Sequence, residues 1–266
     1  MSAIQQKQTL PLSPDRGEDP NGSLHIASRA QSSFRGEPPT RYYVGIAIIA
    51  GLLVFAGFAR SYYLRPLFGF SFLPLFLHLH GIVMTSWFVL FIVQSRLIAA
   101  HRIDLHRRLG IFGAVLAPLM FVMTCAVAIR AGRRGLNPFP EAMTAPAFLL
   151  LNLGVMATFL ILVIAALWLR RRSEFHKRLM VMATISLMGA VFSRLPVEFV
   201  ETGGLWTNIA LEESFVLACV IVDIVRTRRL HPAFLWGGLF TMASYPGLVW
   251  VGNTSAWARL AAWILR

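Results

Sequence analysis

Seven apolar runs, each about 20 residues long, constrain the fold of this chain more than any other feature. A helix of about that length crosses a hydrocarbon core of about 30 Å, and a lipid-exposed backbone must satisfy its hydrogen bonds within its own helix. Only 14% of the 266 residues are charged and the mean hydropathy is +0.63, values atypical of a soluble domain. The sequence therefore predicts an all-α integral membrane bundle of seven transmembrane helices, at about 43–64, 72–97, 109–130, 145–169, 177–200, 205–225 and 233–252.

The two ends of the chain differ from the spans in composition. Residues 1–40 are polar, rich in Ser, Pro, Gln, Arg and Gly, and lack an apolar run long enough for a signal-peptide core. We expect them to form a disordered tail, followed by a transmembrane domain at 41–252. The last segment, 253–266, is too short to span but has one apolar helical face, which predicts an interfacial helix. That face carries Trp257, Leu260, Ala261 and Ile264.

The basic residues predict how the chain is oriented. Most of the 25 lysines and arginines lie in the N-terminal tail or in connections on the same side, near 96–108, 170–178 and 226–229. The positive-inside rule then places the N-terminus in the cytoplasm and the C-terminus in the periplasm. Because the net charge of +13 is distributed in this way and forms no basic helical stripe, we expect no nucleic-acid partner. A retinal protein is also excluded, since Lys7 and Lys177 both lie outside the helix centres.

Polar residues inside the spans predict a pocket in the outer half of the bundle. Ionisable groups are costly in a membrane, so they mark either a structural pair or a site. At 1.5 Å per residue, several of them reach a similar depth of roughly 10 Å from the outer surface. The predicted lining consists of His80, Asn152, Arg194, Glu198 and Glu212. The alternative is an Arg–Glu pair that only locks two helices together.

Two predictions refine this pocket. On helix 72–97, His80 shares one face with Trp87 and Gln94, so we expect that face to point inward. We also expect the change Arg194→Ala to cost more stability or function than Arg178→Ala, because Arg178 lies near the predicted start of its helix.

A second histidine cluster lies on the predicted cytoplasmic side. His106 opens one helix within LHRRLG, and His176 opens another within FHKRLM. Two imidazoles on separate helices are able to bind haem b axially, with neighbouring arginines on its propionates. The same histidines also suit a zinc site, or serve as ordinary anchors at the membrane surface. We assign no metal site from the sequence.

Several segments together resemble a known group of proteins. They are GFARSYYLRP at 57–66, His80-Gly81 followed by Trp87 and Gln94, the two histidine segments, and Arg194-Leu195-Pro196. Over about residues 40–200 the chain resembles a group of uncharacterised bacterial multi-pass membrane proteins. The two histidine segments are also similar, more loosely, to the DUF2306 predicted membrane proteins. The resemblance implies a bacterial inner membrane and carries no known activity.

The leading functional hypothesis is a membrane protein that binds a small, anionic or lipid-like ligand, or serves a redox-accessory role. In the outer pocket Arg194 would clamp an anion, Glu212 would accept a proton or cation, and His80 would relay protons. A haem-binding redox protein through His106 and His176, a metal-dependent membrane hydrolase and a small transporter are the alternatives. The expected partners are the lipid bilayer and that ligand.

Overall fold

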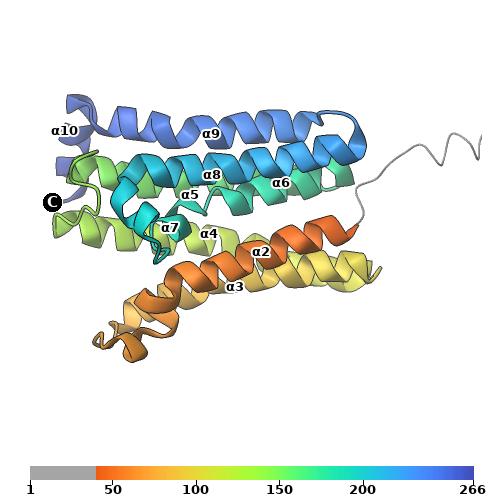
Figure 1. Cartoon of the computed structure of the whole chain (residues 1–266), viewed down its shortest axis with the longest axis horizontal. Coiled ribbons are helices and arrows are strands. Elements are labelled where there is room, and N and C mark those ends of the chain that lie inside the picture. The colour runs from red at the N-terminus through yellow and green to blue at the C-terminus, as the bar shows by residue number, and fades with distance from the viewer. Residues whose placement is uncertain (1–39) are drawn as a thin grey trace, which may run out of the picture. The chain divides into compact units, whose positions relative to one another are not determined.

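The computed structural model describes residues 40–266, and every regular element in that part of the chain is a helix (Figure 1). The predicted disordered tail lies outside the described residues. The elements are α2 (Thr40–Phe58), the π-helix η1 (Ala59–Tyr63), the 3₁₀-helix η2 (Arg65–Phe68), α3 (Leu75–Ala99), α4 (Ile103–Arg133), α5 (Ala145–Trp168), α6 (Ser173–Ile185), α7 (Gly189–Phe192), α8 (Glu198–Thr227), α9 (Pro232–Gly252) and α10 (Ser255–Ile264).

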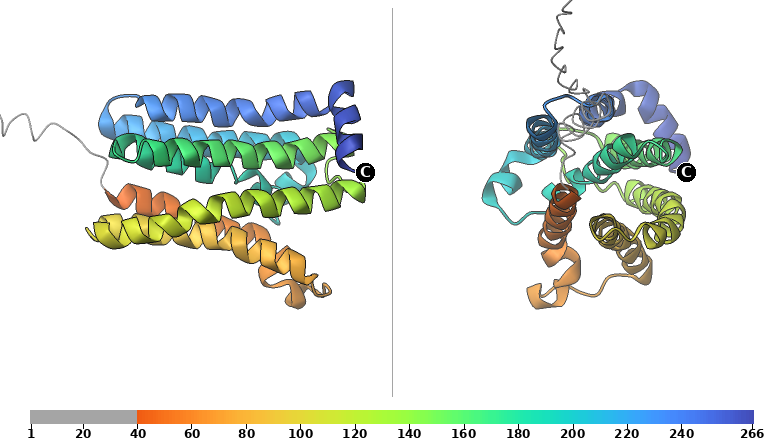
Figure 2. Two further views of the ribbon diagram at one scale, coloured as in Figure 1. Left: turned by 180° about the vertical axis from the view of Figure 1, so that it is seen from behind. Right: turned by 90° about the vertical axis from the view of Figure 1, so that its right-hand side faces the viewer.

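The long helices run antiparallel to their neighbours in the chain, as the short connections predict (Figures 1 and 2). The helices α2, α4, α6 and α9 begin at one end of the bundle, which we call the arginine-rich end. The opposite end carries α10 and is called the α10 end. The basic clusters of the α3–α4, α5–α6 and α8–α9 connections therefore share one end of the bundle.

Within residues 40–266, six segments are long and apolar enough to cross a membrane by length and composition. They are Arg41–Tyr63, Leu75–Ala99, Ile103–Arg133, Ala145–Trp168, Ser173–Phe192 and Pro232–Gly252. α8 is not among them, and it carries the acidic residues Glu212, Glu213 and Asp223. The architecture is therefore an all-helical bundle with six candidate spans.

The predicted helix at 177–200 is wrong in its boundaries. This pass begins at Ser173, breaks after Ile185 and ends at Phe192, the last residue of α7. Pro196 lies in the break before α8, because proline lacks the backbone donor that a continuing helix needs. α8 is interrupted at Gly204, whose φ of +62° is a backbone conformation that glycine adopts readily. The main part of α8 therefore begins close to the predicted position of 205.

The pass formed by α6 and α7 is the centre of the bundle. It is 72% buried, more than any other candidate span, and contacts α2, α5, α8 and α9. The outward faces of the surrounding helices are apolar, with Leu52 63% exposed and Ile111 70% exposed. Apolar side chains on the outside as well as the inside are typical of helices that face lipid.

The C-terminal helix α10 packs against the bundle. Trp257 donates from Nε1 to the Pro146 carbonyl oxygen at 2.6 Å, and Ala261 is fully buried against Ala128 and Leu149. The predicted apolar face thus covers the beginning of α5 and the end of α4, while Leu260 is 48% exposed.

Candidate functional site

The inward face of α3 carries polar side chains along the length of the bundle, from His80 toward the α10 end to Gln94 toward the arginine-rich end. Trp87 is 2% exposed and donates from Nε1 to Thr184 Oγ1 on α6 at 3.2 Å. Gln94 donates to the His106 carbonyl oxygen at 3.1 Å. Toward the α10 end, His80 Nδ1 is buried and has no hydrogen-bond partner among the described residues. The predicted inward orientation of the His80, Trp87 and Gln94 face is confirmed.

Arg194 follows α7 near the α10 end and has no carboxylate partner. Its Nη1 donates to the Ala190 carbonyl oxygen at 2.6 Å and to Ser193 Oγ at 3.2 Å, and its guanidinium lies 5.0 Å from the centre of the Phe58 ring. None of the salt bridges among residues 40–266 includes it. The residue as a whole is exposed, and no carboxylate of the described chain pairs with it.

Arg194 interacts electrostatically with one predicted pocket residue, His80, and with one residue that was not predicted, Tyr245. Its charge acts on His80 of α3 and on Tyr245 of α9, and Tyr245 interacts in turn with Glu212 of α8. Tyr245 adjoins Glu212 at Gly189, and the sequence did not predict it as a neighbour of the candidate site. A single tyrosine in an apolar helix gave no signal of this position.

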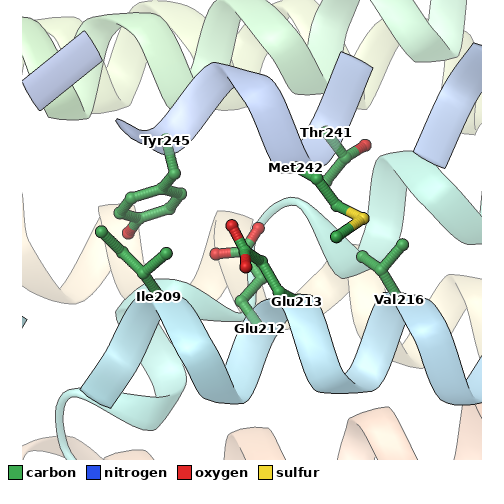
Figure 3. A pocket seen from close by; sticks show the side chains of 7 residues that line it. All are labelled: Ile209, Glu212, Glu213, Val216, Thr241, Met242 and Tyr245. Atoms are coloured by element: carbon green, nitrogen blue, oxygen red, sulfur yellow. The ribbon is translucent and has the colours of Figure 1, made fainter. Parts of the chain in front are cut away.

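Glu212 is held in a tight site between α7, α8 and α9. It is 3% exposed, and its Oε2 atom has no hydrogen-bond partner in the described part of the chain. A Cβ atom added at Gly189 would lie 2.2 Å from the Tyr245 hydroxyl and 2.8 Å from Glu212 Oε2. Figure 3 shows the Glu212 and Glu213 side chains rising from α8 toward α9. The gap there is lined by Ile209, Val216, Thr241 and Met242 in addition to Glu212, Glu213 and Tyr245, and has no space for a water molecule.

Two predicted pocket residues do not share these contacts. Glu198 is exposed at the first turn of α8, and the break that contains Pro196 separates it from Arg194, which follows α7. Arg194 and Glu198, both predicted to line the pocket, therefore do not lie on one helix. Asn152 on α5 donates its amide to the Phe148 carbonyl oxygen of its own helix at 2.7 Å.

The helix–helix lock that the sequence analysis placed at Arg194 is instead formed by Arg178. Its Nε and Nη2 atoms donate to the Asp223 carboxylate at 3.0 and 2.8 Å, and the two side chains are 1% and 0% exposed. Glu174 also pairs with Arg178, and Phe234 of α9 lies 5.6 Å from the guanidinium. The pair joins α6 to α8. An acidic residue within a span, Asp223, was the signal that a buried cation was needed.

The predicted histidine pair also meets in the structure, at the arginine-rich end. The rings of His106 and His176 have centroids 6.4 Å apart and planes at 85°. His176 Nδ1 donates to the Ala166 carbonyl oxygen at 2.9 Å, whereas His106 Nδ1 and Gln94 Oε1 are buried without partners in the described chain. Within residues 40–266 no group of three or more His, Cys, Asp or Glu side chains is arranged to hold a metal ion.

The residues of the GFARSYYLRP segment form the π-helix η1 and its flanks, which pack on α3. The Tyr62 hydroxyl donates to the His78 carbonyl oxygen at 3.1 Å, and Tyr63 shares a hydrogen bond of 2.8 Å with Thr85. A Cβ atom at Gly81 would lie 2.4 Å from the Tyr62 ring, so a glycine is required there. An open apolar groove of about 520 Å³ runs from these tyrosines along α3 to Phe112 of α4.

These observations define the class of protein: over the described residues 40–266 the chain is all-helical, with six helices able by length and composition to cross a membrane and with buried polar groups at two levels. No family model, no curated protein and no solved structure matches the chain.

Proposed function

We propose that the chain is a seven-pass protein of a bacterial cytoplasmic membrane, with its N-terminus in the cytoplasm and its C-terminus in the periplasm. α8 is the additional pass: from Leu205 to Thr227 it extends about 34 Å at 1.5 Å per residue, enough for a hydrocarbon core of about 30 Å. Its acidic residues Glu212 and Asp223 face the interior and are buried. The basic connections at one end support the orientation.

Within that architecture, the proposed function is binding of a small anionic or lipid-like ligand at the α10 end through Arg194. The observation that carries this proposal is an exposed guanidinium without a carboxylate partner, beside the Phe58 ring and within electrostatic reach of His80 and Tyr245. A guanidinium donates several hydrogen bonds in a planar fork that suits phosphate and carboxylate groups. The adjoining aromatic ring supplies an apolar surface for a ligand chain.

The test compares two single-chain lipids that differ in headgroup. The protein is placed in phosphatidylcholine nanodiscs, and its thermal unfolding is followed with added lysophosphatidic acid or lysophosphatidylcholine. Ligand at 100 times its Kd stabilises by about 2.7 kcal/mol, so we expect lysophosphatidic acid alone to raise the unfolding midpoint clearly.

The matched variants are Arg194→Gln and Arg60→Gln. Arg60 is also exposed near the α10 end, but it already pairs with Glu201 at 3.5 Å. We expect Arg194→Gln to abolish the stabilisation and Arg60→Gln to retain it. An equal response of the wild type and Arg194→Gln would disprove the assignment.

The histidine pair supports a second candidate function, binding of haem b. His106 and His176, whose ring centroids lie 6.4 Å apart, would hold the haem iron through one imidazole from each of two helices. A porphyrin iron needs only two ligands from the protein. The Ala166 carbonyl fixes Nδ1–H of His176, which leaves Nε2 as the free ligand atom.

The haem candidate is tested by the visible spectrum after reconstitution with haem b. We expect a Soret band that is lost in His106→Ala and His176→Ala and kept in His101→Asn, a change in the exposed α3–α4 connection. Absence of the band in the reconstituted wild type would remove this second candidate and leave the Arg194 site untouched.

A further inference from the structure

Two buried oxygen atoms on α8, one from Glu212 and one from Asn208, have no hydrogen-bond donor among the described residues. Glu212 and Asn208 are each 3% exposed, and neither Glu212 Oε2 nor Asn208 Oδ1 has a hydrogen-bond partner among residues 40–266. The Asn208 amide nitrogen already donates to the Gly204 carbonyl oxygen at 2.7 Å, which fixes the amide and leaves Oδ1 as the free acceptor.

These two residues are one helical turn apart, so their side chains lie on the same face of α8. An ionised Glu212 has only acceptor atoms, and a buried acceptor without a donor loses the hydrogen bonds that it would make in water. One hydrogen placed on Glu212 removes both deficits, because a protonated carboxyl group donates and the amide oxygen accepts.

No basic side chain supplies a counter-charge to Glu212. The salt bridges of the described chain do not include it, and the groups that face it are Glu213 on α8 itself and Tyr245 on α9. α7 offers only the Gly189 backbone, and the charged residues of α6 lie with Asp223 toward the arginine-rich end. A second carboxyl group nearby disfavours an ionised Glu212 further.

The size of the site selects the cation. The gap between α8 and α9 has no space for a water molecule, so a hydrated metal ion does not fit without movement of the helices. A proton requires no space. Tyr245 interacts electrostatically with Glu212 on one side and with exposed Arg194 on the other, which connects the site to the α10 end.

We propose that Glu212 and Asn208 form a proton-binding site, in which the protonated Glu212 carboxyl donates its hydrogen to Asn208 Oδ1. This site gives the protein a proton-dependent state inside the membrane, and it does not depend on whether Arg194 binds an anion.

Infrared spectroscopy of the full chain in nanodiscs at neutral pH tests the proposal. We expect a carbonyl stretch of a protonated carboxylic acid that shifts to lower wavenumber in D₂O. Glu212→Gln removes this band and is expected to fold, because its amide nitrogen is still able to donate to Asn208. Glu213→Gln is the matched control and keeps the band.

Asn208→Leu provides the second arm. It removes the acceptor, so we expect the band to remain but to move to higher wavenumber as the carboxyl group loses its hydrogen bond. A wild type without the band, or a band that survives in Glu212→Gln, would overturn the proposal. A rise in thermal stability with NaCl over KCl that Glu212→Gln abolishes would also overturn it, since a sodium ion would then occupy the site.

Discussion

Arg178 and Asp223 at the arginine-rich end form an ion pair, whereas Arg194 and Glu212 toward the α10 end do not. Arg178 and Asp223 share two hydrogen bonds and are almost fully buried. Arg194 and Glu212 lie on neighbouring elements, yet no salt bridge joins them. The first arrangement satisfies its own charges and stabilises the bundle. The second leaves an exposed cation and a buried acid available to other chemistry, which is why we assign function there.

The largest expected effect is the loss of the paired arginine. Arg178→Ala leaves Asp223 buried without a partner, and removal of one member of a buried pair typically costs about 3–5 kcal/mol. Thermal unfolding in detergent should show a much lower midpoint than for Arg194→Ala. This order is the reverse of the one expected from the sequence, because Arg178 is buried and paired with Asp223. The double change Arg178→Met with Asp223→Leu should recover most of the loss, because no charge is left buried. A greater loss for Arg194→Ala would reverse the comparison.

A smaller effect is expected from filling the space beside the unpaired acid. Gly189→Ala brings a Cβ atom within 2.2 Å of the Tyr245 hydroxyl, and overpacking of this kind typically costs about 1–3 kcal/mol. Gly247→Ala on α9 is the control, since nothing lies within 4 Å of the added atom. Equal unfolding midpoints for the two variants would show that the site is less tightly packed than the contacts indicate.

A hydrogen bond between α2 and α8 lies close to the Arg178–Asp223 pair, and its loss should reduce stability less than loss of the pair. The Tyr42 hydroxyl donates to the Cys219 carbonyl oxygen at 2.8 Å, one turn from Asp223. Tyr42→Phe should cost about 1 kcal/mol in unfolding free energy, the usual net contribution of one such bond. A loss as large as that of Arg178→Ala would mean that the tyrosine, and not the ion pair, joins the helices.

The smallest effect concerns His231, which precedes α9. Its Nδ1 accepts a hydrogen bond from the Ala233 amide at 3.1 Å, and burial, with the nearby charge of Arg178, lowers the pKa of His231. As the pH falls, His231 is protonated in the unfolded chain at a higher pH than in the folded protein. The stability that the neutral cap contributes is therefore present above about pH 6.5 and is lost as the pH falls below that value.

The unfolding midpoints of the wild type and of His231→Asn are measured from about pH 7.5 to about pH 5. A helix cap of this kind contributes about 1 kcal/mol to the unfolding free energy. Asparagine keeps the cap without titrating, so its curve should fall less steeply. Parallel curves would show that other groups cause the pH dependence.

Part of the candidate site was predictable from local periodicity. Helical spacing placed His80, Trp87 and Gln94 on one inward face, and the polar character of Glu212 marked it as an interior residue. The spacing did not show that Pro196 ends one helix and separates Arg194 from Glu198. It also did not show that Arg178, near a helix end in the sequence, lies fully inside the bundle.

The sequence by itself determined that the chain is helical, which segments are apolar enough to cross a membrane, and which ends of the helices carry the basic residues. Those properties follow from composition and from a repeat of 3.6 residues, which are local. Only the tertiary structure decided which charges meet. Arg178, the partner of Asp223, is 45 residues away in the sequence and lies on another helix. The two side chains meet only because several helices pack together, and a local sequence pattern does not predict that packing.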